Sequence, residues 1–478
     1  MLNLCGIFAT LYPKYMRKLN FIGLLTILLL SASAQAQIEI VKETKIWTLE
    51  ECVKYALANN ITIKQTELDT VDAAINKRGA IGNFLPSVNA NTSHSWNVGL
   101  NQNITTGLLE NQTTQFSAIG ANVGVDIYKG MQNQNNLRRA KLAIIASQYQ
   151  LTKMQEDVAL NVANAFLQVL FNKEFLKVQI EQKAINEKQL LQTQEFVDAG
   201  TLPKGDLLDV KATIASDTQK VIAAENALLI SKLSLAQLLQ LKEFYNFDVV
   251  DETGLSDQYS MLDKTALSIY ENAKQQRTEI KIANTNLEIA MKDLAIAKGA
   301  YQPTLTAFYS YDTRISYNDI SYIENDQLIN ESAPPFWEQF SDNRGQSFGA
   351  QFTIPIFNGF STKNNVERSK VNIERKKIAV EQEDLTLQRN VYTAYTDAKG
   401  ALKAYESALA AAESRQGSYD YAKEKYSVGL MNSFDFFQSQ TLLTNAQSEV
   451  LRTRYDYIFK IKILEFYFGI PISQIMQK

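Results

Sequence analysis

The chain has 478 residues, with 48 basic and 51 acidic side chains and a net charge of −3. It has no basic excess for neutralising phosphates, so we do not expect a nucleic acid partner. Its length would fill two or three ordinary domains and by itself permits an enzyme, a receptor or a structural assembly.

Residues 1–36 have the pattern of a signal peptide that is removed on export. Residues 16–18 are a positive start, residues 21–30 are an apolar run too short to span a membrane, and residues 34–36 form a small-residue cleavage site. We expect Met16 to be the true start and the mature chain to begin at Gln37. No cysteine lies directly after the apolar run, so a lipid anchor is not indicated.

One cysteine and one histidine remain after that cleavage, which limits the chemistry available. Cys52 stands in an amphipathic stretch and is expected to be a buried, inert thiol. Since His94 is the only histidine, metal clusters and histidine-assisted triads have almost no material, and we expect no metal, no cofactor and no enzyme. No apolar run of about 18 residues follows the signal, so any membrane is not entered as helices.

The chain repeats itself, in two halves that we place at 37–261 and 262–478. The matching pairs are 126–141 with 355–370, 198–210 with 427–439, and 82–90 with 299–307. The first two pairs have an offset of 229 residues and the third an offset of 217. A 12-residue insertion must therefore lie between Pro303 and Gly359.

Each half contains two stretches with the period-two pattern of a strand that has one apolar and one polar face. The four stretches are 88–100, 119–127, 305–316 and 347–356. All are about as long as a membrane-crossing strand, roughly ten residues. A half-buried sheet in a soluble domain would explain any one of them, but two matched pairs on an exported chain favour the wall of a barrel. One chain cannot close such a barrel, whereas several copies could.

A long helix follows the second strand of each half. Residues 137–195 contain neither glycine nor proline, and apolar residues recur there at spacings of three, four and seven. These residues are Leu151, Val158, Val162, Ala165, Val169, Leu176 and Ile180. The 70 residues from Gly130 to Gly200, and likewise from Gly359 to Gly429, would reach roughly 105 Å as a helix. Because the pattern resumes after Gly200 and Gly429, each half should supply a long helical hairpin.

Three features of the strand regions have open interpretations. The tyrosine-rich run 301–317 and Trp96 would suit an aromatic girdle at a membrane surface or, equally, the core of a soluble sheet. His94, on the apolar face of its strand, is expected to lie at an interface or subunit contact rather than to bind a ligand. Residues 319–346, which contain acids and two prolines, would be the longer extracellular loop.

The chain resembles the TolC-like outer-membrane efflux proteins from about residue 47 to residue 472. The resemblance rests on residues 47–60, where Thr48 and Glu51 also form a capping box. It rests further on "FLPSV" and "YQPTL" before the strands, and on two turns in which an acid follows the glycine: Gly200 with Asp206, and Gly429 with Asp435. The order, duplication and constant spacing of these motifs make the resemblance specific.

The resemblance implies a mainly helical α+β fold in a homotrimer. Three protomers would build a twelve-stranded outer-membrane barrel, continued by a helical tube across the periplasm. It also implies a passive exit duct for small molecules or proteins in a tripartite drug pump or a type I secretion system. The partners would be a periplasmic adaptor, an inner-membrane transporter and outer-membrane lipid.

The same resemblance places the two glycine turns at the periplasmic tip, where the tube closes. Tyr426, Asp435 and Asp206 match family positions, whereas Met431 and Gln438 stand where the family has an arginine and a second carboxylate. A salt-bridge latch is therefore not expected. A hydrogen bond from the Tyr426 hydroxyl to Asp206 could remain, and Asp209 could return a charge to a ring of acids.

Two explanations of Asp206 and Asp435 stay open. Threefold symmetry would make each a ring of three acids that favours cations. Alternatively, each acid only caps a restarting helix. Among other protein classes, a soluble periplasmic coiled-coil adaptor or structural protein would explain the helices but not the strands. A secreted hydrolase could use Asp206 and Asp209, but these acids have no pocket signature around them.

Overall fold

The computed structural model describes residues 45–102, 109–242, 247–250, 261–325 and 327–470. The expected signal peptide, residues 1–36, and the expected mature start, Gln37, lie outside them. The chain divides into a small unit, residues 1–46 with 243–248, and a large unit, residues 47–242 with 249–478. β1 (Lys45–Trp47) pairs with β4 (Phe247–Val249) in a two-stranded sheet.

The helix and strand bounds repeat at the two offsets found in the sequence. At an offset of 217, α2 (Leu49–Asn59), α3 (Ile61–Gly82) and the first residue of β2 (Ser87–Gln102) correspond to α6 (Ala266–Gln276), α7 (Thr278–Gly299) and the first residue of β5 (Thr304–Ser316). At an offset of 229, α4 (Gln132–Asp198) and the start of α5 (Lys204–Leu238) correspond to α9 (Ser361–Ser427) and the start of α10 (Ser433–Phe468). The duplication and the capping box of Thr48 and Glu51 are confirmed. The boundary between the repeats stays a prediction.

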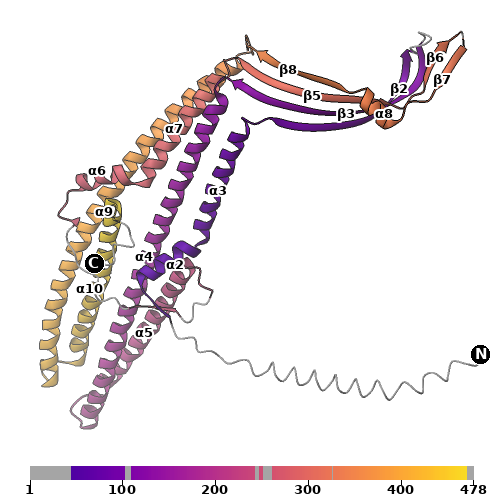
Figure 1. Cartoon of the computed structure of the whole chain (residues 1–478). Helices are drawn as coiled ribbons and strands as arrows, with labels where there is room; N and C mark the ends of the chain where they lie inside the picture. Colours follow the sequence, from indigo (N-terminus) through magenta and orange to yellow (C-terminus); the bar gives the residue numbers. More distant parts are fainter. Residues whose placement is uncertain (1–44, 103–108, 243–246, 251–260, 326, 471–478) are drawn as a thin grey trace, which may run out of the picture. The chain divides into compact units, whose positions relative to one another are not determined.

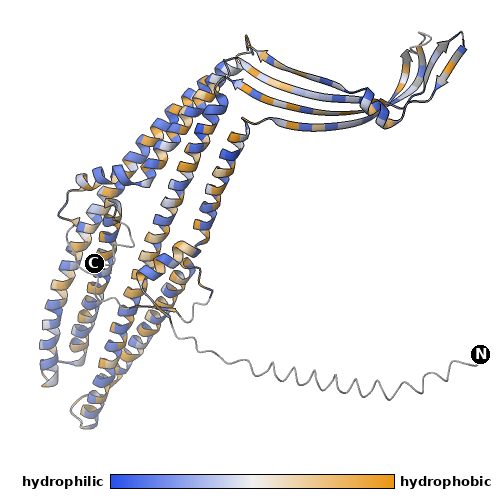
Figure 2. Cartoon of the chain, in the orientation of Figure 1, coloured by the Kyte–Doolittle hydropathy of each residue, from blue (hydrophilic) through white to orange (hydrophobic). Residues whose placement is uncertain are grey.

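Four antiparallel strands form one sheet in the order β2–β3–β5–β8, with β3 at Leu109–Lys129 and β8 at Gly345–Thr353 (Figure 1). The register places the apolar residues of neighbouring strands opposite one another, as in the row Val88, Val123, Tyr309 and Phe348. Polar and apolar residues alternate along these strands (Figure 2). One face of the sheet is therefore apolar and the other polar, as predicted.

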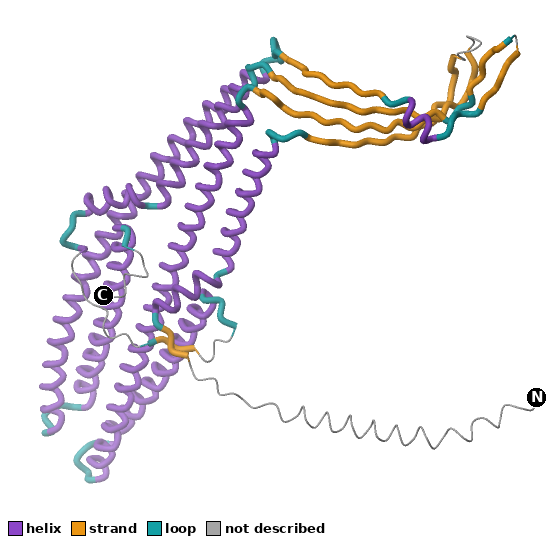
Figure 3. Tube along the Cα trace, in the orientation of Figure 1, coloured by secondary structure: helices purple, strands orange, loops and turns teal. Residues whose placement is uncertain are grey.

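Residues 319–346, which were predicted to be a loop and which lie in the region of the insertion, contain more structure than a loop. β6 (Ile320–Glu324) and β7 (Gln327–Glu331) form a separate hairpin, and the short helix α8 (Phe336–Asp342) follows it. All three lie between Pro303 and Gly359, where the offset changes (Figure 3). α8 contacts β5, so this part of the insertion packs on the sheet.

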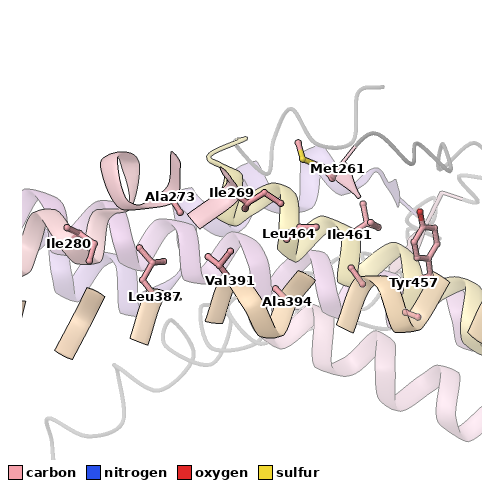
Figure 4. Close-up of a cluster of buried hydrophobic side chains, with 12 residues drawn as sticks. Met261, Ile269, Ala273, Ile280, Leu387, Val391, Ala394, Tyr457, Ile461 and Leu464 are labelled. Atoms are coloured by element: carbon pink, nitrogen blue, oxygen red, sulfur yellow. The ribbon is translucent and has the colours of Figure 1, made fainter. Parts of the chain in front are cut away.

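The long helices pair as hairpins, α4 with α5 and α9 with α10, and α7 packs against both α4 and α9. A core where α6, α7, α9 and α10 meet shows why these helices associate (Figure 4). On α9 the buried residues Leu387, Val391, Ala394, Ala398 and Ala401 alternate spacings of four and three, which is the seam of a coiled coil. Tyr457, Ile461 and Leu464 of α10 pack against that seam.

On α4 the predicted apolar stripe is only partly right. Val158, Val162 and Val169 are buried, but Ile180 is 48% exposed in the chain. Further along α4 the buried positions are polar and occur at every seventh residue: Asn172, Gln179, Asn186 and Thr193. Cys52 is fully buried, as predicted.

By length and apolar composition alone, α5 could pass for a membrane-spanning helix. The absence of a continuous apolar run of about 18 residues did not predict this. The same composition occurs in helices that pack against other helices. In α5 the exposed apolar residues Leu208, Ile222 and Leu229 share one heptad position, while Asp217 is buried among other helices. We therefore interpret this stripe as a surface for another helix, since lipid would favour apolar residues all round.

Candidate functional site

The tip of each hairpin is built on a left-handed glycine. Gly200 has a φ of 73° and Gly429 a φ of 76°, a conformation that glycine adopts without strain. Thr201 N–H donates to Phe196 O (2.9 Å) and Leu430 N–H donates to Lys425 O (2.8 Å). Both tips therefore end their first helix with the same Schellman-type turn, as their matched sequences predict.

An apolar cluster holds the two tips together. Val210 of α5, Ala422 of α9 and Phe436 and Phe437 of α10 are buried in it. The ring of Tyr426 stacks on that of Phe436 with centroids 4.7 Å apart. Met431, at the position of the family arginine, also packs against the cluster, so an apolar side chain here takes the place of an ionic one.

Asp206 links the two hairpins, but not through the partner that the sequence suggested. Its Oδ1 accepts a hydrogen bond from the hydroxyl of Ser433 at the start of α10 (3.0 Å). The buried hydroxyl of Tyr426 has no hydrogen-bond partner among the described residues of the chain. Within one protomer, the Tyr426 to Asp206 hydrogen bond is therefore not formed, because the tyrosine ring packs flat on Phe436 instead.

Asp435 takes part in a helix cap. Asn432 Oδ1 accepts from the backbone N–H of Asp435 (2.8 Å), and Asn432 Nδ2 donates to Asp435 Oδ2 (2.8 Å). The carboxylate of Asp435 is nevertheless exposed, as are Asp209 and Gln438. Capping and a role in a charged ring are thus compatible in this geometry. The four candidate residues near the helix starts lie at the tips of the two hairpins: Asp206 and Asp209 in α5, Asp435 and Gln438 in α10.

The sequence did not reveal a buried polar network that lies between α4, α5 and α10, further from the tip than the apolar cluster. Asn186 Nδ2 donates to Asp217 Oδ2, and Gln440 Nε2 donates to Asn186 Oδ1 (2.8 Å). All three residues are at least nine-tenths buried. They line a groove of about 740 Å³ between α4, α5 and α10. The signal was present as polar residues spaced by seven on α4, but polar residues at heptad spacing are usually assigned to a solvated face.

Neither region resembles a catalytic or metal centre. In the described ranges, no three acidic, histidine or cysteine side chains lie close enough together to hold a metal ion. What the arrangement can do is hold two helical hairpins together at their ends by apolar stacking and a few hydrogen bonds.

Comparison with known proteins identifies the family to which both repeats of the chain correspond. A model of the family "Outer membrane efflux protein" matches residues 52–240 and 269–463, which cover both repeats. The outer membrane protein TolC of Vibrio cholerae is 24% identical over 315 residues, which are 66% of this chain and 68% of that protein.

Solved structures share the fold at low identity. The outer membrane protein VceC of Vibrio cholerae has a TM-score of 0.71 at 13% identity, covering 88% of this chain and 96% of that one. The CmeC outer membrane channel of Campylobacter jejuni has a TM-score of 0.69 at 18% identity, covering 88% and 86%.

Proposed function

This chain belongs to the outer membrane efflux protein family, and on that premise we propose that it is the passive outer-membrane duct of a tripartite efflux pump or a type I secretion system. It is an outer-membrane efflux channel with a helical extension into the periplasm. We propose that it works as a homotrimer with a periplasmic adaptor and an inner-membrane transporter, which supplies the energy.

One observation carries the proposal: a single chain presents a sheet that cannot remain alone in lipid. Among the described residues, its outer strands, β2 and β8, each have only one neighbour in the sheet. In hydrocarbon an unpaired strand edge leaves backbone N–H and C=O groups without partners, so the sheet must close with further copies. Three copies of four strands would give the twelve-stranded barrel that the family resemblance implies.

The repeat also supports a ring of copies. Within one chain Gly130, after β3, touches Gly299, at the end of α7, so closely that a Cβ on Gly299 would lie 2.4 Å from the carbonyl oxygen of Gly130. Around the equivalent glycines, Gly359 and Gly82, no described atom other than those of adjacent residues and of the glycine's own helix backbone lies within 4 Å of the place where a Cβ would stand. Pseudo-symmetry would bring Gly359 of one copy against Gly82 of the next.

We therefore expect Gly82→Ala to lower the fraction of assembled trimer while leaving the helices of each chain intact. Alanine favours the helix over glycine by roughly 1 kcal/mol, so a loss of assembly would have to arise between copies. The measurement is native mass spectrometry of the detergent-solubilised protein. Gly79→Ala, one turn earlier and equally open in the chain, is the matched control. An undiminished trimer in the Gly82 variant would count against this contact.

The proposal as a whole is tested by membrane fractionation followed by mass measurement of the solubilised complex. We expect the protein in the outer membrane and three copies in the complex. The alternative, a soluble periplasmic adaptor or structural protein, predicts extraction without detergent. Recovery of a stable, water-soluble monomer would overturn the proposal.

We propose that Asp206 and Asp435 form rings of charge at the periplasmic constriction. Removing both carboxylates, as Asp206→Ala with Asp435→Ala, should lower the preference for cations on the order of twofold, because the rings supply fixed negative charge at the narrowest point. The measurement is the reversal potential in planar bilayers under a potassium chloride gradient.

Asp435→Asn separates the two roles of this residue. Asparagine can still accept the hydrogen bond from Asn432 Nδ2, so the cap persists while the charge is lost. A ring predicts that this variant also loses cation preference. A residue that only caps the helix predicts unchanged selectivity, which would refute the ring.

A further inference from the structure

The insertion places a helix on the apolar face of the sheet. On β5 the odd-numbered residues, such as Tyr311, Thr313 and Ile315, share a face with the apolar residues of β3. α8 contacts this face: the Thr313 hydroxyl donates to Phe340 O (3.1 Å), and the rings of Tyr311 and Phe340 are 6.3 Å apart. Thr313 and Ile315 are 3% and 0% exposed, whereas Phe348 on the same face is 82% exposed.

Hydrogen bonds fix α8 in that place. The side chain of Gln339 accepts from the backbone N–H of Ser316 and donates to its carbonyl oxygen, both at 2.8 Å. Asn343, just after the helix, donates to Arg314 O (2.7 Å). These bonds occupy backbone groups at the end of β5, so α8 is an attached part of the sheet and not a free loop.

α8 carries three aromatic side chains, of which Trp337 is exposed in the chain. Phe336, Trp337 and Phe340 form one cluster with ring centroids 5.0 to 6.2 Å apart. Trp337 is 76% exposed. The acidic residues of α8 are Glu338, directly after this tryptophan, and Asp342, the last residue of the helix. An exposed tryptophan beside acidic residues suits a surface where apolar and polar surroundings meet.

The composition of the apolar face changes at the level of α8. The row of Tyr309 holds Val88, Val123 and Phe348, but polar residues enter the rows that α8 contacts: Gln346 in the row of Tyr311 and Thr92 in the row of Thr313. The row of Ile315 holds Ser117 and His94, and Trp96 lies two residues beyond. His94 bonds to the Ser117 hydroxyl (2.8 Å), and Trp96 packs edge-on against the His94 ring. Polar and aromatic side chains on a lipid-facing surface mark the interface of the bilayer.

The length of β5 also places α8 at the interface of the bilayer. From Thr304 to Ile315 a strand rising roughly 3.3 Å per residue and tilted by about 40° climbs about 28 Å along the membrane normal. The apolar band of such barrels is about 25 Å tall. The row of Ile315, and with it α8, therefore falls at the outer edge of that band.

We infer that α8 is an interfacial helix of the outer membrane, with Trp337 seated between the headgroups and acyl chains of the outer-leaflet lipid. This rests on the proposed barrel and goes beyond it, because it assigns part of the insertion to lipid instead of to the extracellular medium. The apolar face of the sheet continues into the aromatic side of α8, so one lipid surface covers both.

The test uses the three tryptophans of the chain, Trp47, Trp96 and Trp337. Each is kept in turn while the other two are replaced by phenylalanine, and the full chain is reconstituted in vesicles of phosphatidylcholine with or without bromine on the acyl chains. Brominated lipid should quench Trp337 at least as strongly as Trp96. Bromine near the headgroup end should quench Trp337 more than bromine near the chain end. The buried Trp47 is the unquenched control.

The outcomes separate this inference from the proposed function. If Trp96 is quenched and Trp337 is not, the inference is overturned, whether iodide in water quenches Trp337 or a neighbouring copy shields it. If neither Trp96 nor Trp337 is quenched, the inference is also overturned, and the fractionation and mass measurement described above decide separately whether the barrel stands. Should Trp96→Phe prevent folding, a spin label on Trp337→Cys reports the same depth, through relaxation by oxygen in lipid against a nickel chelate in water.

Discussion

Replacing Asn186 by leucine is expected to lower the free energy of unfolding by about 3 kcal/mol, because two buried polar groups, Asp217 and Gln440, each lose a hydrogen bond at once. The Nδ2 of Asn186 donates to the Asp217 carboxylate, and its Oδ1 accepts from Gln440. Asp217 keeps only Lys220, whose ammonium lies 3.1 Å away on a half-exposed side chain. The measurement is the midpoint of thermal unfolding, followed by the helical circular dichroism signal in detergent.

The triple variant Asn186→Leu, Asp217→Leu and Gln440→Leu tests the cause. It removes the whole network, so no buried group is left without a partner, and buried polar sets replaced by apolar residues are often neutral or stabilising. We expect its midpoint of thermal unfolding to lie close to that of the native protein. If the triple variant were as unstable as the single one, loss of packing would be the cause, and the hydrogen bonds would not matter.

The large-scale architecture could be predicted because it depends on local patterns that recur. The hairpin helices α4, α5, α9 and α10 contain no proline. A left-handed glycine, Gly200 or Gly429, stands at the tip of each hairpin. Away from the register shift between Asp126 and Tyr128, the strands keep a period of two, so the face on which Val88 or Phe348 lies follows from counting. Such signals need no knowledge of which distant segments meet.

The parts that could not be predicted depend on distant pairing. In the sequence, Asn186 has the pattern of a solvated residue. Its burial becomes clear only when Asp217 of α5 and Gln440 of α10 are known to face it. The stacking of Tyr426 on Phe436 likewise depends on how α9 and α10 meet, and it removes the hydroxyl from reach of Asp206 within the chain. α8 was assigned to a loop because its short aromatic run has no periodicity to read.

Replacing Arg277 by asparagine is expected to cost about 3 kcal/mol, since breaking a buried ion pair leaves uncompensated charge. Arg277 is 4% exposed and occupies the N-cap position of α7, where its side chain makes no cap hydrogen bond. Its guanidinium lies 2.8 Å from Glu279 and 3.2 Å from Glu156 of α4, and 4.0 Å from the ring centroid of Phe466 of α10. Asparagine is the natural control residue, because Asn60 caps α3 at the equivalent position of repeat 1.

The cost should depend on pH, with a sign that follows from the two carboxyl groups. Burial opposes ionisation of Glu279, but its hydrogen bonds and proximity to Arg277 hold the pKa below its ordinary value of 4.5, so this group stabilises the fold above that pH. Burial raises the pKa of Glu156 despite Arg277, so its ionised form destabilises the fold. Without Arg277 both groups should favour protonation. The gap in melting temperature should be widest near neutral pH and should narrow as pH falls through 4.5.

The contrasting control for Arg277 is the exposed pair Arg452 and Glu449, joined across one helix turn. Solvent already surrounds both side chains, so Arg452→Ala should change the free energy of unfolding by less than about 1 kcal/mol. If Arg277→Asn cost no more than this, the charge cluster would not be what ties α4, α7 and α10 together. The contact of Arg277 with the ring of Phe466, which the same variant removes, would not be needed either. A cost that did not shrink in acid would point to lost packing, because protonation relieves only the two carboxylates.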